Sequence, residues 1–219
     1  MPAIEGNPSA PQASPELIES LKTFGVALLS DQLRRNRGSK GLIPYHRPAP
    51  LAGTAVTVRT RGGDNLAILR AYDYCRPGDV MVVDADGHVD NALVGGIMTF
   101  AAAALGLAGM VLDGAIRDVA EIRERTFPVY ARGVTHRGPY KDGPGAINVP
   151  VSVGGMTVSP GDIVVGDQDG LVTFSPEEAR AIIEKASTQR AAEEVTMQAI
   201  RDGRWDRAFV DALEARSLN

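Results

Sequence analysis

The chain is poor in the residues that build disulfide frameworks and aromatic surfaces. It has one cysteine, Cys75, and aromatic residues make up 5% of its 219 residues. A single cysteine excludes an internal disulfide. The three histidines show no spacing that would pair one of them with Cys75, so we interpret the thiol as buried rather than nucleophilic. The first residues also lack a basic and an apolar signal segment, and we therefore expect a cytoplasmic protein.

Long runs of one charge are absent as well. The net charge is −4, the pI is near 5.4, and no block of Lys and Arg is long enough to form a nucleic-acid-binding stripe. We therefore expect no nucleic-acid partner. The longest weakly polar run, residues 91–112, is interrupted by glycine and lies between polar turns. This pattern predicts a buried helix, a glycine turn and a buried strand rather than a membrane span.

The remaining composition is that of a globular α/β protein, with 44% hydrophobic and 23% charged residues. Its length favours one domain, which we place at residues 14–219, preceded by a flexible arm at residues 1–13 that is rich in Pro, Ser and Ala. Ser14 offers an N-cap and is followed by a proline and a glutamate, a typical helix start. We predict one helix from there toward Leu33.

Hydrophobic periodicity changes at Gly53. The segments "GTAVTVRT", "GDVMVVDADG" and "AGMVLDG" predict strands, whereas "DNLAILRAYDY" and "NALVGGIMTFAAAALG" predict helices between them. A short helix is expected near residues 119–124, then several short strands, then a long amphipathic helix that opens at Ser175. The predicted fold class is layered α/β with mixed sheets and a long C-terminal helix, whose end is available for subunit contacts.

Loops at the carboxyl ends of neighbouring strands are where open α/β sheets bind ligands. Gly95 and Gly96 form one such segment, although each glycine within a helix costs roughly 1 kcal/mol relative to alanine. One interpretation is close packing against a strand. The other is a loop that enters a helix at Ile97, where free backbone amides and the positive end of the helix dipole would bind a carboxylate.

Arg117 and Asp118 follow the next apolar run, in "VLDGAIRDVAEI". They form either a solvated ion pair or two walls of one pocket. In the second case the guanidinium of Arg117 would bind a carboxylate through two hydrogen bonds, and Asp118 would be an oxygen ligand for Mg²⁺ or Mn²⁺.

The ordered set of these motifs resembles a known family. The string "NALVGGIMTFAAAALGLAGMVLDGAIRDVAEI", with "RPGDVMVVDADG", "FPVYARG", "INVPVSVGGMTVSPGDIVVGDQDGLV" and the late "AAEEV", is similar to the 4-hydroxy-4-methyl-2-oxoglutarate aldolases and the regulator of ribonuclease activity A, the RraA-like family. The likeness covers roughly residues 53–203, and twenty residues separate Gly96 from Arg117.

The resemblance implies a fold, an activity and an assembly. The fold is an α/β/β/α sandwich of the swivelling β/β/α type. The activity is that of a class II, divalent-metal-dependent (Mg²⁺ or Mn²⁺) carbon-carbon lyase. It cleaves 4-hydroxy-2-oxo dicarboxylic acids to pyruvate and a second oxo acid, or decarboxylates oxaloacetate, through a metal-stabilised pyruvate enolate. The assembly is a homotrimer or homohexamer with sites between subunits.

The same resemblance assigns roles to residues. Gly95, Gly96, Ile97 and Met98 match the backbone loop that holds the pyruvyl part of the substrate. Arg117 matches the substrate arginine and Asp118 the metal aspartate, and these two are the catalytic candidates. A glutamate donated by the late helix of a neighbouring subunit would be Glu193 or Glu194.

One departure from the family pattern concerns proton transfer. The aldolases usually carry Asp or Glu where this chain has Gly96, and that carboxylate serves the acid-base step. Decarboxylation of oxaloacetate depends less on such a carboxylate, because stabilising the enolate is sufficient while CO₂ leaves. Two alternatives to the aldolase therefore stay open. One is a non-catalytic regulator or binding protein that acts by protein contact, and the other is the same metal-enolate chemistry on a different oxo acid.

Overall fold

The computed structural model of the chain describes residues 4–35 and 37–217. The strands are β1 (Ile4–Gly6), β2 (Ile43–Pro44), β3 (Leu51–Thr60), β4 (Asp79–Val94), β5 (Gly109–Ile116), β6 (Val129–Val134), β7 (Gly145–Ile147), β8 (Val151–Val153), β9 (Met156–Val158), β10 (Ile163–Gly166) and β11 (Leu171–Phe174). The helices are α1 (Pro15–Leu21), α2 (Val26–Gln32), α3 (Leu66–Ala71), continued by a 3₁₀ turn (Tyr72–Tyr74), α4 (Gly96–Ala104), α5 (Val119–Arg123), α6 (Pro176–Arg201) and α7 (Ala208–Ser217).

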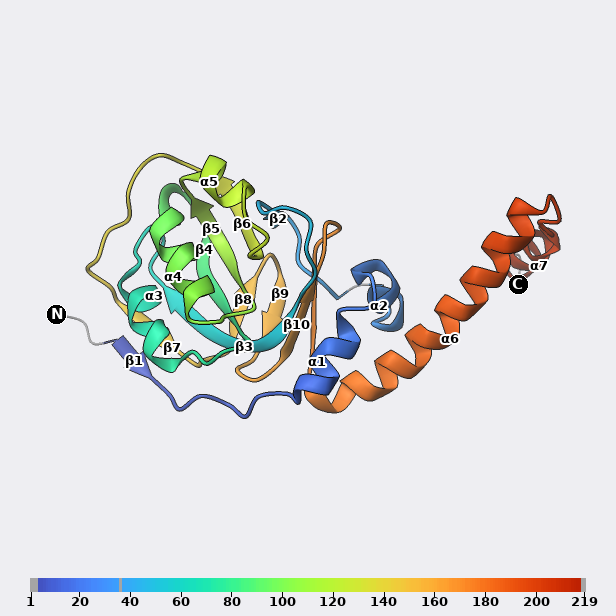
Figure 1. Cartoon of the computed structure of the whole chain (residues 1–219), viewed down its shortest axis with the longest axis horizontal. Helices are drawn as coiled ribbons and strands as arrows, with labels where there is room; N and C mark the ends of the chain where they lie inside the picture. The colour runs from blue at the N-terminus through green and yellow to red at the C-terminus, as the bar shows by residue number, and fades with distance from the viewer. Residues whose placement is uncertain (1–3, 36, 218–219) are drawn as a thin grey trace.

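Strands β3, β4, β5 and β6 form the parallel centre of a mixed sheet with the order β1-β7-β3-β4-β5-β6-β2 (Figure 1). Strand β3 is buried at every residue but Arg59 and β5 at every residue, as expected of parallel strands covered on both faces. Helix α3 connects β3 to β4, and α4 connects β4 to β5. Strand β10 pairs antiparallel with β3 and with β11, so the chain turns into a second β layer. The predicted mixed α/β fold with a long C-terminal helix is therefore confirmed.

Three buried apolar clusters separate the layers. The first lies between the central sheet and helices α3, α4 and α5, with Met81 and Leu112 at its centre. The second lies between the central sheet and strands β8–β11, where Val82 and Val111 meet Val153. The third packs α1, α2 and α6 on the outer face of β10 and β11. This sequence of layers is α/β/β/α, the sandwich that the family resemblance implied.

Two predicted helix boundaries are wrong. Residues 91–94 belong to β4, not to a helix, because β4 runs past irregular pairing with β5 at Asp84 and His88 and ends only at Val94. The N-terminal helix stops at Leu21 and a new one starts at Val26. The carboxylate of Asp167, on the β10–β11 turn, accepts a hydrogen bond from the Val26 amide at 2.7 Å and so caps this second helix start.

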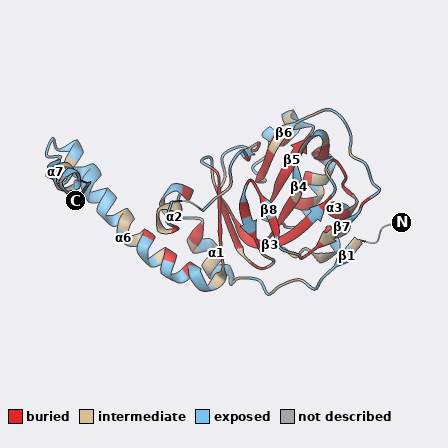
Figure 2. Ribbon diagram, turned by 180° about the vertical axis from the view of Figure 1, so that it is seen from behind, coloured by how far each residue is buried: buried red, intermediate tan, exposed pale blue. Residues whose placement is uncertain are grey.

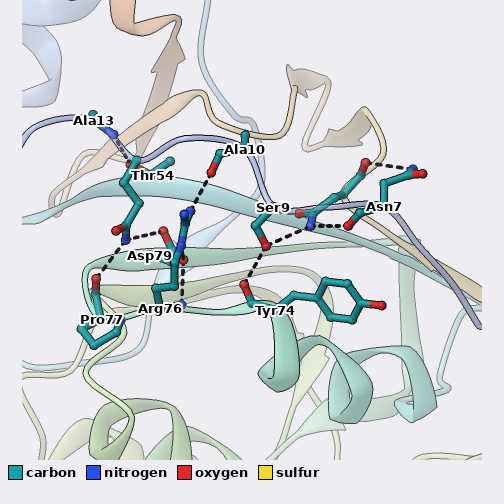
Figure 3. A network of polar contacts seen from close by, with 11 residues as sticks. Asn7, Ser9, Ala10, Ala13, Thr54, Tyr74, Arg76, Pro77 and Asp79 are labelled. Atoms are coloured by element: carbon teal, nitrogen blue, oxygen red, sulfur yellow. Dashed lines mark hydrogen bonds and ion pairs between the residues drawn. The ribbon is translucent and has the colours of Figure 1, made fainter.

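The N-terminal arm lies along the body, whereas the sequence predicted a flexible segment. Strand β1 pairs with β7, and polar contacts continue along the arm to residue 13 (Figure 3). Gln12 donates to the carboxylate of Asp79 at 2.8 Å, and Arg76 donates to the carbonyl of Ala10 at 2.7 Å. The amide of Ala13 donates to the hydroxyl of Thr54 at 3.0 Å. These contacts fix residues 4–13, and residues 1–3 lie outside the described part.

Helix α6 leaves the body halfway along its length. It opens with the predicted cap, in which Ser175 and Glu178 exchange side-chain and backbone hydrogen bonds. Ala179, Ile182 and Ala186 are buried against the outer layer, whereas all residues from 191 to 198 are exposed (Figures 1 and 2). None of the helices in the described ranges is both long and apolar enough to cross a membrane.

The buried His46 predicts how stability depends on pH. Its side chain is 6% exposed, and Nδ1 accepts a hydrogen bond from the Val129 amide at 3.1 Å, which requires an unprotonated Nδ1. Burial lowers the pKa of His46 below its ordinary value of 6.5. The unfolded chain then binds a proton more readily than the folded one. Stability is therefore complete above about pH 6.5 and falls as the pH drops below that value.

We expect urea unfolding to show a loss of about 1 kcal/mol between pH 7 and pH 5.5. In the variant His46→Gln the free energy of unfolding should be lower at pH 7 but flat across that window. A wild-type curve that is flat between pH 7 and pH 5.5 would contradict this account. The carboxylates whose pKa is lowered, among them Asp64 and Glu178, add their own loss only below about pH 4.

Candidate functional site

The predicted site residues lie together at the carboxyl ends of β4 and β5. Helix α4 begins at Gly96, directly after β4, and Arg117 and Asp118 follow the last residue of β5. They line a small cavity of about 50 Å³. Its wall is formed by Asn65, Leu93, Val94, Gly95, Ile97, Met98, Arg117, Asp118 and Pro139. Both predicted loops thus reach one pocket, because β4 and β5 are adjacent parallel strands.

Asp118 has a left-handed backbone, with φ 58° and ψ 36°. This conformation is uncommon for residues other than glycine, although Asp and Asn tolerate it best. It allows α5 to begin while the carboxylate turns back toward α4, where Oδ2 accepts a hydrogen bond from the Gly96 amide at 2.9 Å. One of the amides predicted to hold substrate is therefore occupied by Asp118. The amides of Ile97 and Met98 lack intrahelical acceptors, because they lie in the first turn.

The position of Arg117 is consistent with both interpretations of the charge pair, a solvated ion pair and two walls of one pocket. Its Nε lies 3.8 Å from Oδ2 of Asp118, and the two side chains are 44% and 46% exposed. An ion pair this exposed contributes little to stability. Both residues also line the cavity, and the Arg117 guanidinium lies against Gly138 on the loop after β6. The pair therefore contributes little folding energy, and both side chains are placed where a ligand in the cavity would meet them.

Glu121 is a site residue that sequence reasoning missed. A Cβ placed on Gly96 would collide with the carboxylate of Glu121. Arg125 fixes this carboxylate through an ion pair with Oε1 and also donates to the carbonyl of Gly96 at 3.3 Å. The space that a side chain at position 96 would fill therefore already holds a carboxylate, which comes from α5. The available signal was the spacing, since Glu121 follows Asp118 by three residues on a predicted helix.

Asn65 is the second residue that was missed. It is 2% exposed, and its Nδ2 donates to the carbonyl of Leu93 at 3.1 Å and to Sδ of Met98 at 3.3 Å. Its Oδ1 is buried and has no hydrogen-bond partner, although the residue lines the cavity. A buried unsatisfied oxygen costs free energy unless a ligand or water supplies a donor. Asn65 thus offers an acceptor on the wall formed by the start of α3.

Comparison with known proteins identifies the family of this chain. The profile of the RraA-like family, described as Aldolase/RraA, matches residues 26–173. The chain belongs to this family. The matched region contains Gly96, Arg117, Asp118 and Glu121, and it ends before α6.

Individual relatives of this Aldolase/RraA protein carry different names. A protein of Halalkalibacterium halodurans, whose name proposes a 4-hydroxy-4-methyl-2-oxoglutarate aldolase, is 38% identical over 192 residues, covering 87% of this chain and 91% of the relative. The crystal structure of Streptomyces coelicolor RraAS2, described as an unusual member of the RNase ES inhibitor RraA family, superposes with a TM-score of 0.79 at 29% identity, covering 86% and 98% of the two chains. An uncharacterized protein of Pseudomonas syringae superposes with a TM-score of 0.77 at 26% identity, covering 90% and 96%.

The donor set of this RraA-like protein suits a hard divalent cation. Asp118 and Glu121 present carboxylate oxygens at adjacent positions beside Gly95 and Gly96. No group of three His, Cys, Asp or Glu residues gathers at a metal-binding distance within residues 4–35 and 37–217. Mg²⁺ and Mn²⁺ are commonly held by one or two carboxylates and complete their shell with water and substrate oxygens. Two carboxylates from one chain are thus compatible with such an ion.

Glu193 and Glu194 lie apart from the cavity within one chain of this family member. Both are exposed on the part of α6 that extends away from the body (Figure 1). Glu193 accepts a hydrogen bond from Gln189, one turn earlier on the same helix, at 2.8 Å. Their predicted role requires a second copy of the chain.

Proposed function

We propose that this protein is a divalent-metal-dependent carbon-carbon lyase that forms pyruvate from 4-hydroxy-2-oxo dicarboxylic acids, oxaloacetate or both. The observation that carries the proposal is the composition of one cavity wall. A guanidinium, a carboxylate and two first-turn helix amides converge there, from Arg117, Asp118, Ile97 and Met98, and the carboxylate of Glu121 lies nearby, beside Gly96. Such a set binds a small anion through its carboxylate and its oxo group and stabilises charge on the oxo oxygen.

Each group has a separate task. The amides of Ile97 and Met98 hold the substrate carboxylate at the positive end of α4. Arg117 lies where it neutralises charge that develops on the 2-oxo oxygen when the C3–C4 bond breaks. Asp118 would hold the divalent cation, which when bound would supply Lewis-acid stabilisation of the enolate. The Oδ1 of Asn65 accepts a hydrogen bond from a hydroxyl group or water in the cavity.

In this proposal, Glu121 replaces the carboxylate that is missing at position 96. It stands in the space of that side chain, is fixed by Arg125, and is half exposed to solvent. A carboxylate in this place can take the proton from a substrate hydroxyl and return it to carbon. Aldol cleavage is therefore compatible with Gly96, and the chain is not restricted to decarboxylation.

The same fold occurs in the relative described as a member of an RNase ES inhibitor family, so a regulatory role is the rival function. A regulator that acts through its outer surface has no need for a charged cavity with an unsatisfied buried oxygen. That cavity favours the lyase.

The deciding experiment couples pyruvate release to lactate dehydrogenase. Oxaloacetate and 4-hydroxy-4-methyl-2-oxoglutarate are supplied with Mg²⁺ or Mn²⁺, and the rates are compared with those in chelator and with metal alone. We expect turnover that requires both protein and metal. Folded protein that adds nothing to the rate of metal alone on either substrate would overturn the lyase and favour the regulator.

We further propose that the chain assembles as a homotrimer or homohexamer through α6 and α7. Beyond residue 190 this segment exposes large apolar side chains, which a stable folded protein normally covers. They are Val195, Met197, Ile200, Trp205, Phe209 and Leu213. The segment extends away from its own body, so another copy must supply the covering surface (Figure 2). Contact there would also bring Glu193 or Glu194 toward the site of a neighbour.

The double variant Val195→Glu/Ile200→Glu should therefore lower the oligomer mass in light scattering and reduce pyruvate formation at least about tenfold, because two charges are expensive to bury. The variant Lys185→Glu, exposed on the half of α6 that packs on the body, is the matched control and should keep both. A double variant with unchanged mass would exclude this surface as the interface.

A further inference from the structure

A dicarboxylic 2-oxo acid has a second carboxylate that the described cavity does not recognise. The cavity of about 50 Å³ is close to the share of one or two water molecules, which is too small to enclose a whole dicarboxylic acid. The only cation in its wall is Arg117, which is already committed to the oxo end. The rest of such a substrate must extend through the mouth and meet whatever side chains surround it.

The mouth has one apolar side and one basic side. On the α4 side, Ile97 is 87% exposed and Phe100 is 61% exposed. On the opposite side runs the loop after β6, in which His136 and Arg137 precede Gly138 and the wall residue Pro139. A Cβ on Gly138 would lie 3.2 Å from Nη1 of Arg117, so this loop passes directly beside the substrate arginine.

The backbone of this loop is held firmly. The carbonyl of Arg137 accepts from the Ala92 amide at 2.9 Å, and the carbonyl of Gly138 accepts from Nδ2 of Asn91 at 2.8 Å. The Thr135 amide donates to the carbonyl of Ile116 at 3.0 Å. These bonds tie the loop to the ends of β4 and β5, the same two strands that position the site.

Other arginines around the site already have anionic partners. Arg125 pairs with Glu121, and Arg61 pairs with the buried carboxylate of Asp64. Arg137 is exposed, and within residues 4–35 and 37–217 no acidic side chain, carbonyl or ring engages its guanidinium. The backbone of Arg137 is fixed next to Gly138, which lies beside Arg117, and a guanidinium that starts from this position is suited to bind a carboxylate through two hydrogen bonds.

We propose that Arg137 binds the distal carboxylate of the substrate and thereby selects dicarboxylic over monocarboxylic 2-oxo acids. This inference rests on the proposed function and adds to it a residue that determines specificity. His136 precedes Arg137 on the same rim and presents a second polar group there. The apolar side of the mouth, with Ile97 and Phe100, covers the carbon chain between the two carboxylates.

The test compares two ligands that differ only in the distal carboxylate. 2-Oxoglutarate and 2-oxopentanoate have the same chain length, and neither carries the hydroxyl group needed for cleavage. Their affinities for the Mn²⁺-loaded full-length protein are measured by calorimetry. We expect the wild type to prefer 2-oxoglutarate at least about tenfold, as one charge-assisted contact provides. Arg137→Gln should remove the preference by weakening 2-oxoglutarate alone.

Lys141→Gln is the matched control, since Lys141 is an exposed cation on the same loop, three residues after Gly138, and has no ion pair within residues 4–35 and 37–217. The Lys141→Gln variant should keep the wild-type preference for 2-oxoglutarate over 2-oxopentanoate. A preference that survives in Arg137→Gln, or a wild type that binds both ligands equally, would overturn the role of Arg137 while leaving the lyase intact. A wild type that binds neither ligand and releases no pyruvate would overturn both.

Discussion

Replacing Asp118 by Asn should give a folded protein whose metal-dependent pyruvate formation has fallen on the order of a thousandfold, the effect of removing a group that serves transition-state charge. Asn is close in shape to Asp and tolerates the left-handed backbone at φ 58°. Its amide oxygen can still accept from the Gly96 amide, the bond that Asp118 makes at 2.9 Å. The variant therefore changes the charge and the metal affinity and spares the local fold.

Asp118→Ala provides the contrast. Alanine loses the acceptor for the Gly96 amide and adds strain at the positive φ, so this variant should also lose about 1–2 kcal/mol of unfolding free energy. Steady-state kinetics with varied Mn²⁺ and thermal unfolding of both variants separate the two effects. An Asn variant that retains wild-type activity at wild-type metal concentrations would show that Asp118 holds only the start of α4.

Substitutions at Gly96 and at Glu121 should show which of the two positions provides the carboxylate for the reaction. Glu121→Gln is expected to lower aldol cleavage about a hundredfold, within the range for a lost general acid or base. Gly96→Glu should lower it as well, because the new side chain meets the carboxylate of Glu121 and disturbs its pairing with Arg125. A family-like carboxylate at position 96 is thus expected to be detrimental in this chain.

The double variant Gly96→Asp/Glu121→Ala avoids the collision between a side chain at position 96 and the carboxylate of Glu121. Gly96 is not among the residues with a positive φ, and the three atoms nearest to a Cβ at this position all belong to Glu121, so replacing Glu121 by Ala removes the collision. We expect this double variant to be at least about tenfold more active in aldol cleavage than Glu121→Ala alone, a non-additive result that marks two positions sharing one space. Equal activity of the two variants would separate Glu121 from proton transfer.

The sequence predicted the parts of this site that depend on local pattern. Apolar runs that end in Gly or Asp placed Gly95 and Arg117 at strand ends, and parallel pairing then brings such ends together. Asn65 could not be found this way, because it belongs to a helix start thirty residues earlier and its importance comes from one unsatisfied oxygen. Glu121 could not be found this way either, because only three-dimensional packing shows that α5 fills the space beside Gly96.

The same difference between local pattern and long-range packing explains which predictions about the fold were wrong. A strand that continues through irregular pairing with its neighbour has no clear period, so residues 91–94 resembled the helix that follows them. The arm at residues 4–13 has the composition of a loose segment, yet its order comes from partners far away in the chain, such as Asp79 and Asn148. The cap on Ser175, by contrast, depends on residues three positions apart, and local sequence is sufficient to predict it.

The central claim, that this cavity and a divalent cation stabilise a pyruvate enolate, is tested most directly without any assumed substrate. Pyruvate is incubated with the protein in D₂O, and exchange of its methyl protons is followed by NMR. We predict exchange that requires both the protein and Mg²⁺ or Mn²⁺, is lost with chelator, and falls strongly in Asp118→Asn. Exchange no faster than with metal alone, or exchange that persists in chelator, would contradict the account.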